Sequence, residues 1–263
     1  MPSEYIAKVG GAVCKCSDDL LIEGVRSKSR LPKNSRSVIT FAFPYWVGER
    51  EGRNLSLYAM LPDYHDVVMK RLEGYADKLR SLCPDNEFEC FCDASPVNEV
   101  RAAARAGLGS LGQNGLIITR DYGALIFIGE IVTDLEIEAD GGISPCDGCQ
   151  KCIKACPTGA LSEKGFCRSL CRSHISQKKG ILSESEENSL KDGKLAWGCD
   201  CCVMACPYSK ASKLTSIDEF LNDVEPVLSY ENMDRLIKNR AFSWRGKAVL
   251  ERNLRLTEGE TKQ

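Results

Sequence analysis

The stretch CDGCQKCIKACPTGA, residues 146–160, carries four cysteines with two, two and three residues between them, and a proline follows the last. This spacing is typical of proteins with two iron–sulfur clusters, in which three thiolates bind one cluster and the fourth binds the other. Thiolates are soft ligands that suit iron–sulfur cores. The stretch therefore predicts a cluster-binding module, and it requires a second cysteine-rich half elsewhere.

The second half is CDCCVMACP, residues 199–207, which closes on the same Cys-Pro pair. In ferredoxin-like modules the closing cysteine of each half serves the opposite cluster. We therefore expect two 4Fe–4S clusters, the first of them bound by Cys146, Cys149, Cys152 and Cys206. The second would take Cys156, Cys199, Cys202 and one further cysteine. The candidates for that last ligand are Cys167, Cys171 and Cys201, although Cys201 lies between two ligands and is expected to point away.

Zinc is the main alternative for these cysteines. Zinc sites use CxxC pairs separated by a longer loop. They need neither the third close cysteine nor the Cys-Pro ending, which occurs twice here. The pattern favours iron–sulfur clusters over zinc knuckles, and both over a disulfide framework.

The composition bounds the class of protein. The chain has 263 residues and a net charge of -2, so no basic excess indicates nucleic-acid binding. The start lacks the pattern of a signal peptide, and no apolar run reaches the roughly 20 residues of a membrane helix. Fifteen cysteines in such a chain indicate metal binding in the reducing cytoplasm.

The cysteines also suggest domain boundaries. Ten of the fifteen lie between Cys146 and Cys206, and the polar, glycine-rich stretch EADGGISP (138–145) precedes them and reads as a loop. We predict an α/β domain at 1–140, a double-cluster domain at 141–215, and a helical segment with a polar tail at 216–263.

Residues before the cysteines alternate between strand and helix patterns. SRSVITFAFP (35–44) is a continuous apolar run that predicts a buried strand. A helix is expected from Asp63 to Leu82, a strand at 87–93, and a helix that opens at Ser95-Pro96 and stops at Gly107. Segments 116–119 and 124–132 read as a hairpin. Together they predict an α/β layer with mixed strand pairing.

Gly107, Gly109 and Gly112 fit the GxGxxG pattern. In a dinucleotide-binding fold this pattern follows a strand and opens a helix, whereas here it follows a helix and precedes a strand. We therefore reject a nucleotide site. A glycine-dense loop still allows the backbone to approach a large flat ligand, and the alternative is a turn with one glycine helix cap.

Asp93 is the acid of most interest, because strand ends in α/β sheets face ligand crevices. Its apolar and small neighbours would raise the pKa of the carboxyl and suit it to donating a proton. The alternative is a helix cap. The two histidines, His65 and His174, are expected to be surface polar residues, and Cys90 and Cys92 to lie in the core. The roles of Cys14, Cys16 and Cys83 stay open.

Three segments in order resemble the epoxyqueuosine reductase family. They are YAMLPDYHDVVMKRL (58–72), DASPVNEVRAAARAGLGSLGQNG (93–115) and the two cysteine clusters. The similarity covers roughly residues 35–256. Members of this family use cobalamin and two 4Fe–4S clusters to make queuosine in tRNA, and they are distant relatives of reductive dehalogenases.

The resemblance implies a corrinoid-binding type of N-terminal module that receives single electrons from the clusters. It implies Asp93 as proton donor, a corrinoid contact at Gly112, Gln113 and Asn114, and Cys171 as the remaining ligand of the second cluster. It also implies an external electron donor such as ferredoxin or flavodoxin, and a tRNA substrate. The helical repeats that help the family hold tRNA are missing after residues 243–256.

Two functions follow from these patterns. The first is a cobalamin-dependent and iron–sulfur-dependent reductase, with epoxyqueuosine in tRNA as the best single substrate and a different small substrate as a variant of it. The second is a non-catalytic electron-transfer or corrinoid-handling protein.

Overall fold

A computed structural model describes residues 1–139 and 141–259 of the chain. The chain divides into two compact units: unit 1 is Met1–Pro44 with His65–Gly148, and unit 2 is Tyr45–Tyr64 with Cys149–Gln263. The predicted boundary at residue 140 and the end of the predicted tail, residues 260–263, lie outside the described residues. The three predicted domains stay a prediction.

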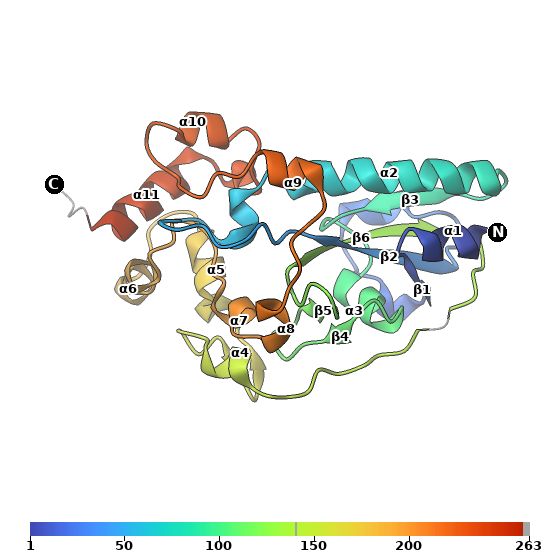
Figure 1. The fold of residues 1–263 in the computed structure, drawn as a ribbon, viewed down its shortest axis with the longest axis horizontal. Helices are drawn as coiled ribbons and strands as arrows, with labels where there is room; N and C mark the ends of the chain where they lie inside the picture. Colours follow the sequence, from blue (N-terminus) through green and yellow to red (C-terminus); the bar gives the residue numbers. More distant parts are fainter. Residues whose placement is uncertain (140, 260–263) are drawn as a thin grey trace. The chain divides into compact units, whose positions relative to one another are not determined.

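Unit 1 is built on one four-stranded sheet. Its elements are α1 (Pro2–Lys8), β1 (Ala12–Lys15), the 3-10 helices η1 (Asp18–Leu20) and η2 (Arg26–Arg30), β2 (Ser37–Pro44), α2 (Tyr64–Leu82), β3 (Phe88–Phe91), α3 (Glu99–Arg105), β4 (Ser110–Leu111), β5 (Ile117–Ile118) and β6 (Ile126–Thr133). The strand order in the sheet is β1-β2-β6-β3, so the last strand in the sequence lies inside the sheet (Figure 1).

Every ladder of this sheet is antiparallel. The prediction of mixed pairing is therefore wrong for the sheet, and in residues 1–139 and 141–259 parallel pairing occurs as two isolated bridges, Leu55 with Trp197 and Leu111 with Pro145. The two central strands, β2 and β6, pair antiparallel along their whole length, from Ser37–Thr133 to Pro44–Ile126. Each edge strand then runs antiparallel to its central neighbour, β1 to β2 and β3 to β6.

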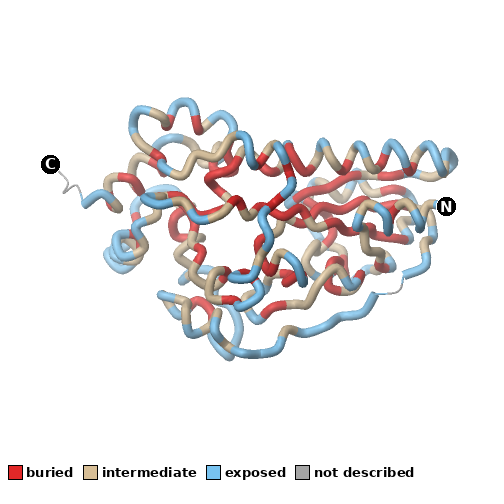
Figure 2. The backbone as a smooth tube through the Cα atoms, in the orientation of Figure 1, coloured by how far each residue is buried: buried red, intermediate tan, exposed pale blue. Residues whose placement is uncertain are grey.

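Helices cover both faces of the sheet, which explains why the central strands are almost continuously apolar. A Cβ on Gly129 of β6 would meet Val68 and Leu72 of α2 within 2.9 Å, so α2 packs directly on that face. On the other face, Ala102 of α3 packs in one apolar cluster with Val38 of β2. Figure 2 shows β2 and β6 buried along most of their length.

Several predicted elements are confirmed. The strand at 35–44 is β2, and the helix from Asp63 is α2, which begins at Tyr64. The predicted helix after Ser95-Pro96 begins later, at Glu99, because the side chain of Asn98 accepts a hydrogen bond from Arg101 N and caps it. The helix ends before Gly107, which has φ 74° and is the predicted stop.

The predicted hairpin of 116–119 with 124–132 is wrong. β6 uses both of its edges to pair with β2 and β3, so no edge is left for β5. β5 pairs with β4 instead, and the two segments meet only in an isolated bridge between Thr119 and Gly123.

Unit 2 is mainly helical. It contains η3 (Leu57–Met60), α4 (Lys151–Lys154), β7 (Leu161–Ser162), β8 (Gly165–Phe166), η4 (Arg168–Leu170), α5 (Arg172–Ser176), α6 (Glu184–Gly193), α7 (Cys201–Met204), α8 (Pro207–Lys210), α9 (Asp218–Asn222), α10 (Met233–Leu236), η5 (Ser243–Arg245) and α11 (Lys247–Glu258). None of the helices among the described residues is long and apolar enough to cross a membrane.

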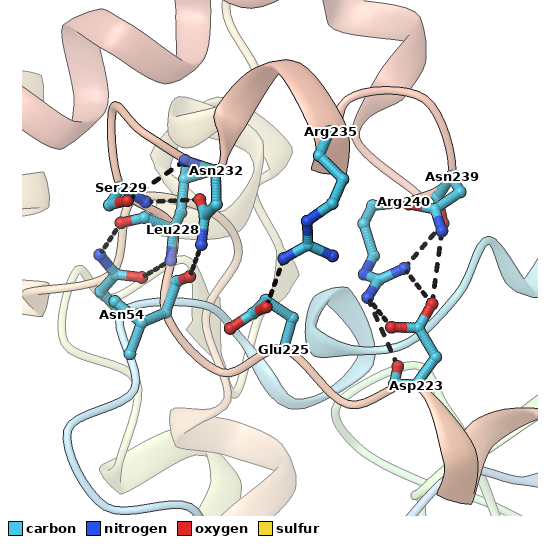
Figure 3. A network of polar contacts seen from close by, with 10 residues as sticks. Asn54, Asp223, Glu225, Leu228, Ser229, Asn232, Arg235, Asn239 and Arg240 are labelled. Carbon is cyan, nitrogen blue, oxygen red and sulfur yellow. Dashed lines mark hydrogen bonds and ion pairs between the residues drawn. The ribbon is translucent and has the colours of Figure 1, made fainter.

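The segment 45–64 belongs to unit 2 although it precedes α2 in the sequence. Asn54 exchanges two hydrogen bonds with the backbone of Leu228, at 2.8 and 2.7 Å (Figure 3). In the same network the buried Arg240 binds both carboxylate oxygens of Asp223, and Arg235 pairs with Glu225. These contacts hold the C-terminal helices against a segment that is distant in sequence.

Candidate functional site

Asp93 does not end the strand, as the sequence predicted, but lies two residues beyond β3 in a tight turn. Its φ of 59° is in the left-handed region, which a residue other than glycine adopts at a cost. The turn is closed by a hydrogen bond of 2.6 Å from Ser95 N to the Asp93 carbonyl. Strained backbone of this kind gathers at functional sites, where neighbouring structure maintains it.

The Asp93 carboxylate has a partner that the sequence analysis treated as a surface residue. His65 of α2 places Nε2 3.0 Å from Asp93 Oδ2, and the two side chains keep 37% and 46% of their exposure. The pair is therefore reachable from solvent. Protonated imidazole beside a carboxylate makes a charge-assisted contact, so His65 orients Asp93 and links it to a second proton-carrying group.

Glu99 lies behind this pair in the first turn of α3. Its Oε2 is shielded from solvent and has no hydrogen-bond partner among the described residues. Burial, and then the negative charge of Asp93, raise the pKa of Glu99 to about 7, although the Asp93 N–H and the charge of His65 act the other way. A buried carboxylate without a full set of partners favours its neutral form.

Glu130 is a second buried acid in the same region. It lies in the middle of β6, is 1% exposed, and accepts a hydrogen bond from the Ser95 hydroxyl through Oε1. Its Oε2 is also buried without a partner in the described part of the chain. Burial raises the pKa of Glu130 to about 8, with a smaller contribution from the charge of Glu99.

Sequence reasoning missed His65 and Glu130 as members of this site. Glu130 could have been found, because an acid inside the apolar run 124–132 is costly to bury without a function or a partner. His65 could not, since 28 residues separate it from Asp93 and only the packing of α2 beside β3 brings them together.

The glycine-rich loop forms a tight turn between β4 and β5, as its position after a helix predicted. A Cβ on Gly112 would come within 2.4 Å of Asn114 Oδ1, and one on Gly109 within 2.7 Å of the Ile118 carbonyl, so both positions require glycine. Asn114 Oδ1 accepts from Leu116 N, while its Nδ2 is buried with no partner among the described residues. That donor is free for a bound group.

In unit 2 the two cysteine-rich halves form short helices that pack on each other. α4 carries Cys152 and leads to Cys156-Pro157, and α7 carries Cys202 and leads to Cys206-Pro207. α4 and α7 are in contact. Burial and then the charges of Cys171, Cys156 and Cys152 raise the pKa of Cys202 to about 12, which shows that thiols of both halves face one another.

Backbone amides are directed at one of these sulfurs. Leu161 N lies 3.4 Å from Cys156 Sγ. Burial alone would raise the pKa of this thiol, but hydrogen bonds from the Leu161 and Thr158 backbone lower it overall. A thiolate is what a cluster requires as a ligand, so the surroundings of Cys156 fit that role.

The three candidates for the last ligand differ in their surroundings. Cys171 precedes α5 and is one of the thiols that face Cys202, whereas Cys167 is exposed and bonds to Ser169. The neighbouring Cys199 thiol lowers the pKa of Cys201 to about 6, and the expectation that Cys201 points away from the cluster stays a prediction. The ligand assignments themselves stay predictions. Within the described residues no three potential ligands converge on a point that would hold one metal ion.

The expectation that Cys90 and Cys92 lie in the core is confirmed. Cys14, Cys90 and Cys92 are buried in unit 1, and burial raises the pKa of Cys14 to about 12. His174 accepts a hydrogen bond from Arg168. Asp200, between Cys199 and Cys201, is an anchor that the sequence did not reveal: it pairs with Arg53 at 2.7 Å and accepts from Leu57 N.

Comparisons with protein families match two parts of the chain. Residues 145–209 match the model of a 4Fe-4S double cluster binding domain. Residues 26–94 match the model described as "Epoxyqueuosine reductase QueG". The first match agrees with the predicted double-cluster module and covers all the cysteines proposed as ligands.

Curated relatives extend the similarity. The epoxyqueuosine reductase of Lactococcus garvieae is 34% identical over 203 residues, which is 73% of this chain and 57% of that protein. That of Synechocystis sp. is 33% identical over 214 residues, 74% of this chain and 71% of that protein. The chain thus spans a little over half the length of some relatives and more than two thirds of others.

Solved structures agree. A crystal structure of epoxyqueuosine reductase with an epoxyqueuosine-modified tRNA-Tyr stem loop has a TM-score of 0.80 at 26% identity, covering 97% of this chain and 79% of that one. A selenomethionine-labelled epoxyqueuosine reductase gives 0.82 at 25%, covering 97% and 80%. A catabolic reductive dehalogenase gives 0.51 at 15%, covering 97% and 35%; this shows a likeness of fold alone.

Proposed function

Because this chain belongs to the epoxyqueuosine reductase family, we propose that it reduces epoxyqueuosine to queuosine in tRNA, with two 4Fe–4S clusters and cobalamin as cofactors. The observation that carries the proposal is the pairing of a double-cluster domain at 145–209 with an acid turn at Asp93 in a chain of this family. The tRNA bound to the solved relative supports the same substrate here.

The cofactors fit the residues. Ten cysteines lie in the cluster domain, and the charges of Cys152 and Cys156 from the first half and of Cys171 act on Cys202 in the second half. The likeness in fold to a reductive dehalogenase, together with the family, supports a corrinoid. The unpartnered Nδ2 of Asn114 would donate to it from the loop of Gly112, Gln113 and Asn114. A bound corrinoid supplies a strongly reducing cobalt, and the clusters supply it with single electrons.

Asp93 has the role of the acid in this proposal. Removing an epoxide oxygen as water takes two electrons and two protons, and a group near the oxygen has to donate the first proton as the C–O bond opens. Asp93 is held by a strained turn, is oriented by His65 and is open to solvent on its other side. The alternative role, a cap of α3, is filled by Asn98.

The electrons come from a separate protein of low potential, such as ferredoxin or flavodoxin, because the clusters only transfer them. The proposed tRNA substrate and cluster thiolates support a reaction in the cytoplasm. Both statements follow from the proposed reaction, and the donor is testable by reconstitution with the candidate proteins.

The test uses protein purified without oxygen and loaded with iron and sulfide. Added cobalamin should change the absorption spectrum. With reductant and an epoxyqueuosine-modified stem loop, the product should lose one oxygen atom by mass spectrometry. Spectra that show only cluster bands, unaltered by cobalamin, together with no loss of oxygen, would support instead a non-catalytic electron carrier.

A further inference from the structure

Two buried acids that the reaction above does not use lie beside Asp93. Glu99 and Glu130 each keep one carboxyl oxygen buried and without a hydrogen-bond partner in the described residues. They come from different elements, α3 and β6, and both approach the turn that carries Asp93 and Ser95. A folded protein rarely buries two carboxyls without cations to balance them unless they carry protons.

The contacts connect these acids in a row. Ser95, two residues after Asp93, donates its hydroxyl to Glu130 and accepts from Val97 N. The Asp93 backbone N–H donates to Glu99. His65 reaches the outer side of Asp93, where the site is open to solvent. The row therefore consists of three acids around one turn: Glu130 in the dry interior, Glu99, whose Oε2 is buried and whose charge acts on Glu130, and the half-exposed Asp93.

The reaction proposed above needs protons that these three acids can supply. Loss of an epoxide oxygen as water breaks two C–O bonds and consumes two electrons and two protons. The clusters deliver the electrons from the external donor, but Asp93 carries one proton only. We infer that Glu99 is a positioning residue that returns a proton to Asp93, so that Asp93 delivers both protons needed to release water, and that Glu130 keeps Glu99 protonated. This inference rests on the proposed function.

The step balances. The Asp93 carboxylic acid gives the first proton to the oxygen and becomes a carboxylate. The Glu99 carboxylic acid then gives its proton to Asp93, which passes it on, and water leaves. Asp93 and Glu99 both end as carboxylates, and each takes one proton from solvent through the Asp93–His65 pair before the next turnover. Near neutral pH a proton is available on Glu99, because burial and the negative charge of the Asp93 carboxylate raise the pKa of Glu99 to about 7.

Other charged groups around the row are few and are paired. On the β1 side, the charge of Glu130 contributes to raising the pKa values of the Cys14 and Cys16 thiols. The arginines of α3, Arg101 and Arg105, pair with Asp19. On the α2 side, His65 is the cationic group that acts on Glu99. Among the described residues no arginine or lysine forms an ion pair with Glu99 or Glu130, which leaves protons to neutralise them.

The first experiment needs no cofactor turnover. Carboxyl protonation is followed from pH 5 to pH 9 by infrared difference spectroscopy of the reconstituted protein. Two carboxyl groups should still carry protons at pH 6 and release them at higher pH. Glu99→Gln should remove one and Glu130→Gln the other, while Glu87→Gln, on the exposed surface of unit 1, should remove neither. Full ionisation of all carboxyls by pH 6 would overturn the inference.

The same titration tests the coupling. Since the charge of Asp93 raises the pKa of Glu99, Asp93→Asn should shift the release of the Glu99 proton to lower pH. An unchanged midpoint would show that the two groups do not share protons, and would also overturn the inference. These results hold whether or not the protein reduces epoxyqueuosine, so they separate this inference from the proposed function.

The second experiment measures turnover of the epoxyqueuosine-modified stem loop against pH. Turnover of the unaltered protein should fall as pH rises through about 7. Glu99→Gln should lower kcat by about tenfold to a hundredfold, less than loss of a direct general acid, leave KM unchanged and abolish that fall. Unchanged kcat and an unchanged profile would contradict the relay. Absence of turnover in the unaltered protein would contradict the proposed function instead.

Discussion

The two units of this protein differ in how far apart their candidate functional residues lie in the sequence. The cysteines proposed as cluster ligands come mainly from two short sequence stretches, 146–156 and 199–206, which belong to unit 2 from Cys149 onward, and the spacing itself sets their arrangement. Unit 1 gathers His65, Asp93, Glu99 and Glu130 from a helix, a turn, a second helix and a central strand. The comparison shows that a cofactor site with local ligands is readable from sequence, whereas a proton site built by packing is not.

The largest expected effect is the loss of turnover when the acid site of unit 1 is altered. Asp93→Asn keeps the shape of the side chain and its contact with His65 but cannot donate the proton, so epoxide turnover should fall about a hundredfold to ten-thousandfold. Iron content and cobalamin binding should not change. Asp85→Asn, on an exposed loop of the same unit, is the matched control. Near-normal turnover in Asp93→Asn would leave Asp93 with a structural role only.

The next effect tests the ligand set of unit 2. Cys206→Ser should disturb the cluster held by Cys146, Cys149 and Cys152, and Cys171→Ser the other cluster, so each variant should lose about half of its iron. Cys167→Ser and Cys201→Ser should keep the full iron content. Iron analysis paired with paramagnetic resonance distinguishes the clusters. Equal iron loss in Cys167→Ser and Cys171→Ser would move the last ligand, and a change in the opposite cluster would refute the exchange of closing cysteines.

A third effect concerns how pH acts on unit 1. Glu130 binds its proton more tightly when folded, since its pKa rises from 4.5 to about 8. Its contribution to stability is therefore complete below about pH 4.5 and is lost as pH rises toward 8. Glu130→Gln should remove this part of the pH dependence, and its Tm should fall less between pH 5 and pH 8 than that of the unaltered protein. Parallel curves would show that Glu130 is ionised in the fold.

The smallest expected effect compares helix caps in the two units. Asn98 caps α3 beside the acid site, and Ser183 caps α6 in unit 2 with a capping box. Each cap is worth about 1 kcal/mol, so Asn98→Ala and Ser183→Ala should each lower Tm by a few degrees. Only Asn98→Ala should also reduce turnover, because α3 positions Glu99. Equal turnover in both variants would show that the acid site tolerates movement of α3.

The sequence by itself determined the double-cluster domain, the strand at 35–44 and the helix from Asp63. These features are local: cysteine spacing, apolar runs and caps act over a few residues. The pairing directions of the sheet, the partner of β5 and the assignment of 45–64 to unit 2 were outside its reach, since each depends on contacts between residues far apart in the chain.

The acid site shows the physical reason most clearly. The motif around Asp93 predicts an acid at the end of a strand, but the proton affinity of that acid depends on the residues that surround it. The imidazole of His65 reaches it across 28 positions and Glu130 lies 37 positions away, on the strand that enters the sheet last. Burial and neighbouring charge set the proton affinity of a carboxyl, and both are properties of the packed sheet and helices. The sequence determined which acids exist, and the tertiary structure decided which of them are buried, so that the pKa values of Glu99 and Glu130 are raised.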